Sequence, residues 1–462
     1  MRDRSPTAKL LIAGLVGLVL LIPIIMVYGL VADRQQQARV AQDAITAGAG
    51  GAQIVSGPLL AIPYTQQNLV RTVTDGKPTT RTETVRSEIY LFPETHALST
   101  SLEPELKRKA IYETVTFLAK MEGEARFALP RDLEPYGVTR GQLDLEDAQL
   151  RFSTSDPRGL RSAATISVRG QRIDLTPGKG GAQGGGGFHG QVEWDGIASL
   201  NVDYAYVLRG SRSLSLRPQG GETRWAVQSP WQHPGFGGGF LPDDSTIGAD
   251  GFTASWTVGN LALGQGLMST SDTPVSPPEA PRVEYRVLEG SSGDLGLATI
   301  DLVEPADIYA QVDRSVKYGF LFIGFTFLAF LLFDVVGGAR VAAAEYLLTG
   351  AGLVLFFVLL LAFAEVTGFV LAYVMASAAI IGLLTAYSAA VLGGWKRAGF
   401  IGGLLTALYG GLYILLSLEE ASLLIGSLAM FVALAGVMYA TRNLDWSQTV
   451  RRETEGEGGY AA

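Results

Sequence analysis

The sequence predicts an integral membrane protein with six transmembrane α-helices, one N-terminal and five C-terminal, and a large, mainly antiparallel β domain between them. Two observations support this fold class. Charged residues are concentrated in the middle of the chain: residues 33–316 hold 26 Lys and Arg and 34 Asp and Glu, whereas the other 178 residues hold only 10 basic and 10 acidic residues. The flanks contain apolar runs long enough to cross a bilayer, while the middle alternates apolar and polar residues with the period of a strand.

The first transmembrane helix is predicted over residues 10–32, a run without charge that follows a basic N-terminus. At about 1.5 Å per residue, this run is long enough to cross the hydrocarbon core. A cleaved signal peptide has a shorter apolar core of about 7–15 residues, so we expect an uncleaved anchor. Residues 33–46 are polar and favour helix, and they predict a stalk that ends at the glycine-rich segment 48–51.

The other five helices are predicted from apolar runs in the last third of the chain. These runs cover residues 318–336, 346–364, 366–395, 398–418 and 421–441. The predicted organisation is therefore a short N-terminus (1–9), the first helix (10–32), a β-rich domain with a helical stalk at its start (33–316), a five-helix bundle (317–441) and a C-terminal tail (442–462).

The charges between the runs predict the orientation. Basic residues follow the second, fourth and sixth runs, namely Arg340, Lys396, Arg397, Arg442, Arg451 and Arg452. Acidic residues follow the third and fifth runs, namely Glu365, Glu419 and Glu420. Because Lys and Arg are enriched on the cytoplasmic side of a membrane, both termini are expected in the cytoplasm and residues 33–316 on the opposite side.

Strand patterns fill the middle segment. In residues 84–92, for example, Val85, Ile89 and Leu91 share one face. Similar alternation predicts strands within 110–121, 142–152, 164–175, 191–208, 223–229, 252–258 and 282–289. Two stretches rich in Gly or Pro, 177–190 and 269–281, are expected to be flexible insertions. The first matches the spacing of a phosphate-binding loop, but a strand rather than a helix follows it, so a mobile hairpin tip is favoured.

The sequence offers no catalytic or metal-binding pattern. The chain has no cysteine, which excludes disulfides, thiolate metal sites and cysteine nucleophiles. Its three histidines, His96, His189 and His233, are far apart in sequence, and the motifs of serine hydrolases, P-loop proteins and kinases are absent. We therefore expect no enzyme activity and no cofactor. The net charge of −8, without a basic stripe, argues against nucleic-acid binding.

Two groups of residues are candidate sites. An aromatic, glycine-rich region could form an interaction surface, or its members could belong to the core: Trp231, His233, Phe236, Phe240 and Trp256, with Trp225 nearby. The second group is a charge cluster expected at the membrane interface, made of Asp334, Arg340 and Glu345. A local interfacial ion cluster explains these three charges without transport.

Several segments together resemble the CreD family of bacterial inner-membrane proteins. These segments are LLIPIIMV in the first apolar run, SGPLLAIPY at 56–64, WQHPGFGGGFLP at 231–242, GFTASW at 251–256, the membrane-entry segment at 305–334, YLLTG at 346–350, AEVTGF at 364–369 and ALAGVMYATRNLDW at 433–446. No segment is a catalytic signature, and the specificity lies in their order along nearly the whole chain. The insertion at 177–190 has no counterpart in this resemblance.

The resemblance implies a multi-pass protein of the bacterial inner membrane, with residues 33–316 in the periplasm and a role in cell-envelope integrity or envelope stress. It carries no assigned reaction. The expected mechanism is non-enzymatic interaction of the periplasmic domain with an unidentified envelope protein, with membrane lipids around the helices. The alternative is a transporter or channel for a lipid or small amphiphile that uses the C-terminal bundle. The ligand, the partner and the oligomeric state stay open.

Overall fold

The computed structural model describes residues 6–74, 77–109, 112–161, 164–180, 186–270, 296–302, 308–335 and 341–417, with single positions between 427 and 439. Two compact units make up the chain. The β unit comprises Val40–Pro305, and the membrane unit comprises Met1–Arg39 and Ala306–Ala462. Helix α1 (Pro6–Ala49) is continuous across the boundary between them. It ends at Ala49, so residues 33–46 are helical.

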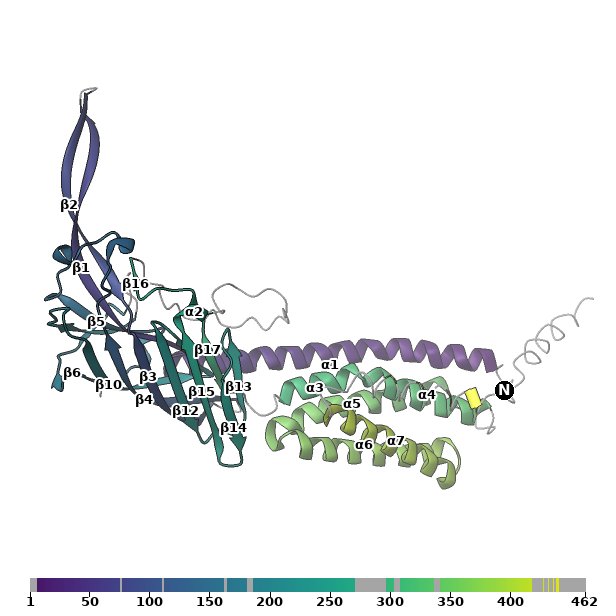
Figure 1. The fold of residues 1–462 in the computed structure, drawn as a ribbon. Helices are drawn as coiled ribbons and strands as arrows, with labels where there is room; N and C mark the ends of the chain where they lie inside the picture. Colours follow the sequence, from purple (N-terminus) through teal and green to yellow (C-terminus); the bar gives the residue numbers. More distant parts are fainter. Residues whose placement is uncertain are drawn as a thin grey trace, which may run out of the picture. The chain divides into compact units, whose positions relative to one another are not determined.

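The β unit contains two large sheets (Figure 1). The first has the order β13-β17-β11-β1-β5-β9-β8, with β2 paired to β1 and β16 paired to β2. Its strands are β1 (Gln53–Thr74), β2 (Lys77–Leu91), β5 (Ala148–Thr154), β8 (Thr176–Pro177), β9 (Gly187–Val192), β11 (Ser213–Arg217), β13 (Pro234–Gly238), β16 (Met268–Ser269) and β17 (Ala298–Leu302).

The second sheet has the order β14-β15-β12-β3-β4-β10-β6-β7. Its strands are β3 (Thr95–Lys109), β4 (Tyr112–Phe127), β6 (Thr165–Val168), β7 (Gln171–Arg172), β10 (Leu200–Ser211), β12 (Glu222–Ser229), β14 (Asp244–Gly248) and β15 (Gly251–Gly259). Among the described strands, β1 with β11 and β3 with β12 pair in parallel, and the other pairs are antiparallel. The prediction of a mainly antiparallel β domain is confirmed.

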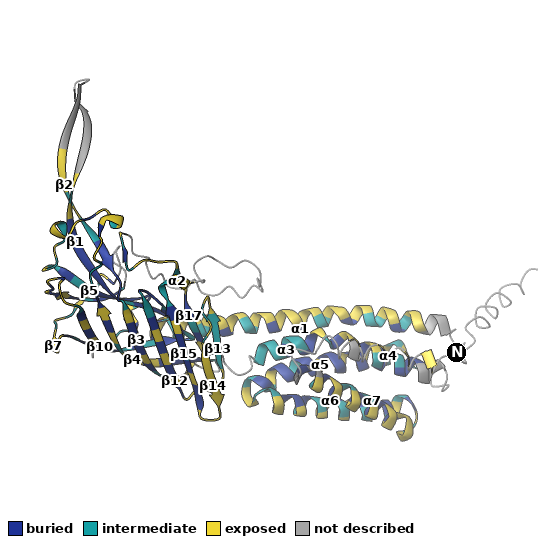
Figure 2. Cartoon of the chain, in the orientation of Figure 1, coloured by how far each residue is buried: buried dark blue, intermediate teal, exposed yellow. Residues whose placement is uncertain are grey.

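Both sheets contribute to one hydrophobic core. Strands alternate buried and exposed residues, as Figure 2 shows, because successive side chains point to opposite faces of a sheet. In β3, for example, Leu98 and Leu102 are buried and Ser99 is exposed. The core joins Leu60 of the first sheet to Phe117 of the second and to many other apolar residues. The β unit is therefore a β-sandwich.

Short connecting helices complete the β unit. They are the α-helix α2 (Asn260–Leu263) and the 3₁₀-helices η1 (Glu134–Tyr136), η2 (Arg140–Gln142) and η3 (Pro157–Gly159). The hairpin of β1 and β2 projects from the sandwich (Figure 1). Its register runs from Leu60 opposite Leu91 to Thr74 opposite Lys77.

The membrane unit is helical. Besides α1, it contains α3 (Ile308–Lys317), α4 (Gly319–Val335), α5 (Ala343–Thr367), α6 (Phe369–Val391) and α7 (Trp395–Ser417). One face of α1 is buried on this bundle, at Ala13, Leu20, Val27 and Val31. Their spacing of seven, seven and four residues matches a narrow helical seam. Leu20 contacts Gly350 of α5, where a larger side chain would overlap it.

Three described helices are long and apolar enough to cross a membrane: α1, over Leu10–Ala49, α5 and α6. They confirm three of the six predicted spans. The predicted span at 318–336 is α4, which has 17 residues and is preceded by the polar helix α3. Helix α7 corresponds to the predicted span at 398–418. The predicted span at 421–441 lies almost entirely outside the described residues, so six spans remain a prediction.

Three predictions within the β unit need correction or lie outside the described residues. Residues 187–190, expected in a flexible insertion, belong to β9 and pair with β5. Glycine is needed at Gly187 because its φ is +142° and a side chain there would overlap the backbone of Phe152. The strand predicted over 191–208 is two strands, β9 and β10, separated by a loop. The strand predicted over 282–289 lies outside the described residues.

Gly123 in β4 provides a test of the sandwich packing. A methyl group at this position would overlap the ring of Tyr204, the cross-strand partner in β10. We expect Gly123→Ala to lower the free energy of unfolding by about 1–3 kcal/mol, because the overpacked ring must shift. The measurement is denaturant unfolding of the purified chain, followed by tryptophan fluorescence. Gly141→Ala is the control, since a methyl group there meets nothing within 4 Å; equal stabilities of the two variants would contradict this packing.

Candidate functional site

The predicted aromatic region lies where both sheets end. Strand β13 is the edge of the first sheet and β14 is the edge of the second. Between them the chain brings Phe236 and Phe240 to Trp256 of β15. The rings of Phe236 and Trp256 are 5.9 Å apart in an edge-to-face arrangement, and the indole nitrogen of Trp256 donates to the Phe240 carbonyl at 3.1 Å. Trp256 also stacks on Trp225 at 4.7 Å.

The aromatic residues of this region differ in burial, and some belong to the core while others lie at its edge. Trp256 is 2% exposed and belongs to the sandwich core. Trp231, Phe236 and Phe240 are half-buried and pack against that core. His233 is exposed, and its carbonyl accepts a hydrogen bond from the indole nitrogen of Trp231 at 3.0 Å. The aromatic side chains thus pack mainly against the core at the end of the sandwich. This agrees with the alternative, left open by the sequence, that they are core residues.

The exposed feature of this region is strand β14. All five of its residues are exposed, including Ile247 with 53% of its surface accessible. It pairs with β15 on one side and is the last strand of its sheet. A terminal strand presents backbone N–H and C=O groups that can pair with another extended chain. The part of this region open to a partner is therefore the sheet edge, with the half-buried aromatic residues beside it.

Of the three side chains in the predicted charge cluster, the structure describes only that of Glu345. Arg340 and the side chain of Asp334 lie outside the described residues. Glu345 is in the first turn of α5, where its carboxylate accepts a hydrogen bond from the Ala342 backbone N–H at 2.7 Å. A carboxylate in this position satisfies a free donor at the helix N-terminus and interacts favourably with the helix dipole. Glu345 thus has a structural role as a helix cap.

The structure reveals an ion pair between a buried arginine and a half-buried glutamate that the sequence did not indicate. The guanidinium group of Arg151 in β5 is almost completely buried and makes two hydrogen bonds, of 2.8 and 2.6 Å, to the carboxylate of Glu88 in β2. Burial raises the pKa of Glu88, but the hydrogen bonds and charge of Arg151 outweigh this effect and lower the pKa overall. The two residues are 63 positions apart in sequence and each follows an ordinary strand alternation, so no local signal identifies the pair.

A second buried polar pair lies inside the sandwich. His96 Nε2 and the hydroxyl of Tyr204 share a hydrogen bond of 2.7 Å. Burial lowers the pKa of His96 to about 4, and burial together with the neighbouring Tyr206 raises the pKa of Tyr204. Both groups are therefore neutral at pH 7. The pair satisfies two polar groups within the core, which makes it a structural feature of the β unit.

A polar hollow of about 530 Å³ lies on the outer face of the second sheet. Charged residues of β4, β10 and β12 line it, including Glu124, Asp203 and Arg224. Asp203 and Glu124 are directly opposite each other in the strand register, and Arg224 pairs with Glu222 at 2.6 Å. No group of three potential metal ligands occurs among the described residues. The hollow carries charges of both signs and favours no particular ligand.

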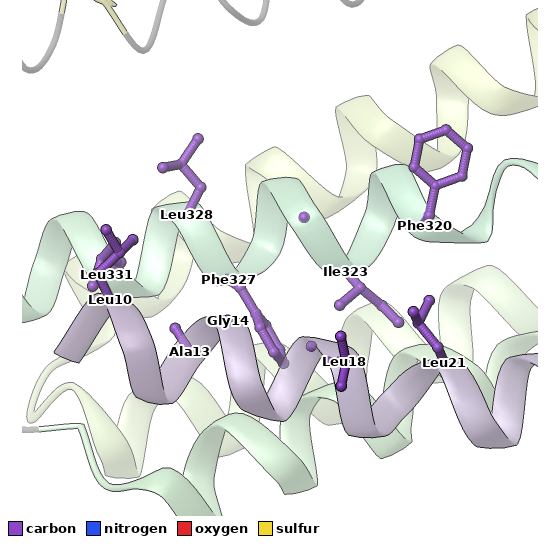
Figure 3. A pocket seen from close by; sticks show the side chains of 12 residues that line it. Leu10, Ala13, Gly14, Leu18, Leu21, Phe320, Ile323, Phe327, Leu328 and Leu331 are labelled. Atoms are coloured by element: carbon purple, nitrogen blue, oxygen red, sulfur yellow. The ribbon is translucent and has the colours of Figure 1, made fainter. Parts of the chain in front are cut away.

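The membrane unit contains an apolar groove between α1 and α4 (Figure 3). Its volume is about 500 Å³. The lining consists of Leu10, Ala13, Gly14, Gly17, Leu18, Leu21, Phe320, Ile323, Gly324, Phe327, Leu328 and Leu331. None of these side chains carries a polar atom, so the groove is suited to hydrocarbon alone.

A β-sandwich joined in one chain to long apolar helices defines an integral membrane protein with a large water-soluble domain. Comparisons with known proteins identify its family. The family model described as inner membrane protein CreD matches residues 5–447. The inner membrane protein CreD of Escherichia coli (strain K12) is 32% identical over 439 residues, which cover 93% of this chain and 91% of the relative. The chain belongs to the CreD family of inner membrane proteins, as the resemblance of its segments indicated.

The buried His96 predicts how the stability of the β unit depends on pH. In the unfolded chain this histidine titrates near pH 6.5, whereas in the folded chain it titrates near 4. As the pH falls below 6.5, the unfolded state therefore takes up a proton that the folded state excludes. The free energy of unfolding should fall by roughly 1.4 kcal/mol per pH unit between about pH 6 and pH 4.5.

Denaturant unfolding at pH 6.5 and pH 4.5 measures this decrease in the free energy of unfolding. His96→Gln, which keeps a polar group in place but has no titrating ring, should show a smaller decrease than the natural chain. His189→Gln is the matched control, because His189 lies in β9 and is only half-buried. An equal decrease in the natural chain and in His96→Gln would assign the pH dependence to other groups.

Proposed function

We propose that this protein supports the integrity of the bacterial cell envelope as a non-enzymatic interaction protein, through binding of an envelope protein by its β unit. The observation that carries this proposal is the exposed edge strand β14 beside the aromatic cluster of Trp231, Phe236 and Phe240. An extended segment of the partner would add to the sheet at β14. The backbone would supply affinity, and the neighbouring aromatic side chains would supply specificity.

The segments on either side of this edge, 231–242 and 251–256, resemble the CreD family, which also supports the proposal. The segment WQHPGFGGGFLP at 231–242, one of those that resemble the CreD family, contains β13 and leads directly into β14. Its glycines serve the local backbone: Gly238 has a φ of +85°, and a side chain there would overlap the carbonyl of Leu297. The segment thus contains strand β13, the connection to β14 and the half-buried aromatic residues Trp231, Phe236 and Phe240.

The proposed topology places the β unit in the periplasm. Residues 33–316 would be translocated and both termini would be cytoplasmic, as the distribution of basic residues favours. The bundle of apolar helices would then act as the anchor, with six spans if residues 421–441 also cross. An outer location gives the exposed edge of β14 access to envelope proteins.

A charge placed on the edge strand tests the proposed binding mode. Ile247→Lys should leave the fold intact, because Ile247 is exposed, but should block strand addition, since edge lysines oppose pairing. Cells that carry this variant alone should be as sensitive to detergent as cells without the protein. Ile197→Lys is the matched control, because Ile197 is 81% exposed and lies away from β14. Full resistance in cells with Ile247→Lys would contradict binding at this edge.

The natural absence of cysteine allows a direct test of topology. A single cysteine at Asp132, an exposed residue of the β unit, should react with a membrane-impermeant maleimide in spheroplasts. A cysteine at Lys396, an exposed residue in the first turn of α7, should react only after the membrane is permeabilised. The opposite labelling pattern would overturn the periplasmic assignment of residues 33–316.

The apolar groove favours a second candidate function, the transport of a lipid or small amphiphile by the helical bundle. Crosslinking in intact cells distinguishes the two functions, with probes at Asp132 and at Lys396. Enrichment of specific envelope proteins by the probe at Asp132 supports the interaction function. Co-purification of a lipid without any enriched protein, relative to a membrane protein of the same topology, supports transport instead.

A further inference from the structure

The second sheet extends one strand beyond the first at the end where the aromatic residues lie. Strand β15 is covered by β13 of the first sheet, because the ring of Phe236 lies 5.7 Å from Phe252 and 5.9 Å from Trp256. Strand β14 is the next and last strand of the second sheet (Figure 1). All five of its residues are exposed. Within the described chain, both faces of β14 and its outer edge are therefore open.

One face of β14 continues the core side of the sheet. Directly opposite residues of antiparallel strands share a face. Ile247 is opposite Phe252, which is buried in the sandwich core. Ile247 therefore lies on the core side, yet 53% of its surface is exposed. An apolar side chain on the same face of an added strand would remove part of this surface from water, which is favourable.

The other face of β14 is polar, and acidic residues lie at both ends of the strand. Asp244, the first residue, and Thr246 point away from the core side, because successive side chains of a strand alternate between its faces. Asp250 lies in the turn that joins β14 to β15. From Asp244 to Gly248 the strand spans roughly 14 Å at about 3.4 Å per residue. A segment that runs along β14 therefore has an acidic residue near each of its ends.

The charge around this edge is uniformly negative. Residues 225–270 contain three aspartates, Asp243, Asp244 and Asp250, and no lysine or arginine. The carboxylate of Asp243 accepts a hydrogen bond from the Thr257 backbone N–H at 2.6 Å, which fixes it in place. Neither Asp244 nor Asp250 pairs with a basic side chain in the part of the chain that the structure describes. Their charges are therefore available to a partner.

This charge distinguishes between the strands that could add to β14. A second copy of β14 would bring Asp244 and Asp250 close to their own counterparts, and an acidic segment would also place like charges together. Like charges that face each other across an interface disfavour a complex. A basic segment would instead make favourable contacts at both ends of the strand.

We propose that the segment which adds to β14 is a cationic strand in which Lys or Arg alternates with apolar residues. Its basic side chains lie on the outer face, toward Asp244 and Asp250. Its apolar side chains lie on the core side, where they cover Ile247 and extend the apolar surface that begins at Phe236. This inference rests on the proposed function, because it names the chemistry of the partner at the same edge.

Binding of labelled peptides to the full chain in a nonionic detergent, followed by fluorescence anisotropy, tests this pattern. Each peptide has about eight residues, a usual strand length. The first alternates Lys and Val, the second alternates Glu and Val, and the third has the composition of the first with its lysines and valines in two blocks. The Lys–Val peptide should bind about tenfold more tightly than the Glu–Val peptide, because opposite charges replace like charges at exposed positions. It should also bind more tightly than the block peptide, which cannot separate charged from apolar side chains on the two faces of a strand.

Neutral variants test the role of the two aspartates. Asp244→Asn with Asp250→Asn should weaken binding of the Lys–Val peptide about fivefold, the effect of two exposed ion pairs. Both side chains are exposed, so the sandwich should be unaffected. The matched control is Asp132→Asn with Glu146→Gln, which removes the same charge from exposed residues between β4 and β5. This control should bind like the natural chain, and an equal loss in both double variants would contradict recognition by Asp244 and Asp250.

Ile247→Lys separates failure of this inference from failure of the proposed function. Equal binding of the Lys–Val and Glu–Val peptides, abolished for both by Ile247→Lys, would overturn the preference for a cationic strand but leave binding at β14 in place. Binding that Ile247→Lys does not change would mean that the peptides bind elsewhere, which also overturns the inference. The detergent sensitivity of cells with Ile247→Lys tests the proposed function independently of any peptide.

Light scattering of the purified chain tests the competing occupant, a second copy. The natural chain should have the same mass as the Ile247→Lys variant. A dimer that Ile247→Lys converts to a monomer would show that two copies pair at this edge despite their charge, and would overturn the proposal.

Discussion

The packing of Leu20 against Gly350 is the contact on which the membrane unit depends. Helix α1 is separated from the other helices of the membrane unit by more than 250 residues, and its buried positions Ala13, Leu20, Val27 and Val31 are all apolar. Close approach of α1 to α5 therefore requires a small residue, which Gly350 supplies. When α1 packs against α5 in this way, the adjacent face of α1, which carries Gly14 and Gly17, lines the groove toward α4. The groove is thus a consequence of how one helix is held.

The β unit depends on a different constraint, the satisfaction of polar groups inside a sandwich. His96 and Tyr204 bond each other in the core, and Trp225 donates to Thr100 at 2.9 Å. On the other face of the first sheet, opposite the core residues Leu150 and Phe152, the side chain of Arg151 is buried with Glu88 as its partner. Such pairs add little net stability over apolar residues, but removal of one member leaves a costly unpaired group. They favour one pairing of the strands over alternatives that would separate the partners.

The two units offer surfaces of different chemistry. The β unit presents a sheet edge suited to an extended protein segment, whereas the membrane unit presents a groove lined by apolar side chains alone. The two sites are far apart in sequence and use different forces, namely backbone pairing in water and hydrocarbon contact in the bilayer. Membership of the CreD family places both in an inner-membrane protein.

The sequence alone determined the fold class, because composition and periodicity are local properties. A charge-free run such as 10–32 can only be stable as a helix in hydrocarbon, and alternation such as that of Val85, Ile89 and Leu91 predicts a strand with one buried face. The same local signals predicted the continuous helix that ends at Ala49. They also indicated the family, since the matching segments keep their order over the chain.

Tertiary structure alone decided the sites, because each depends on residues that only folding brings together. Trp256 and Phe236 looked alike in sequence, yet one is core and the other lies at the rim. The pair of Arg151 and Glu88 arises from strand pairing across 63 residues. The polar helix α3 was assigned to the water-soluble domain because charge normally excludes a segment from the membrane. The hydrogen bond from Tyr309 to Glu365 places the start of α3 beside the end of α5, a contact between residues 56 positions apart that only folding creates.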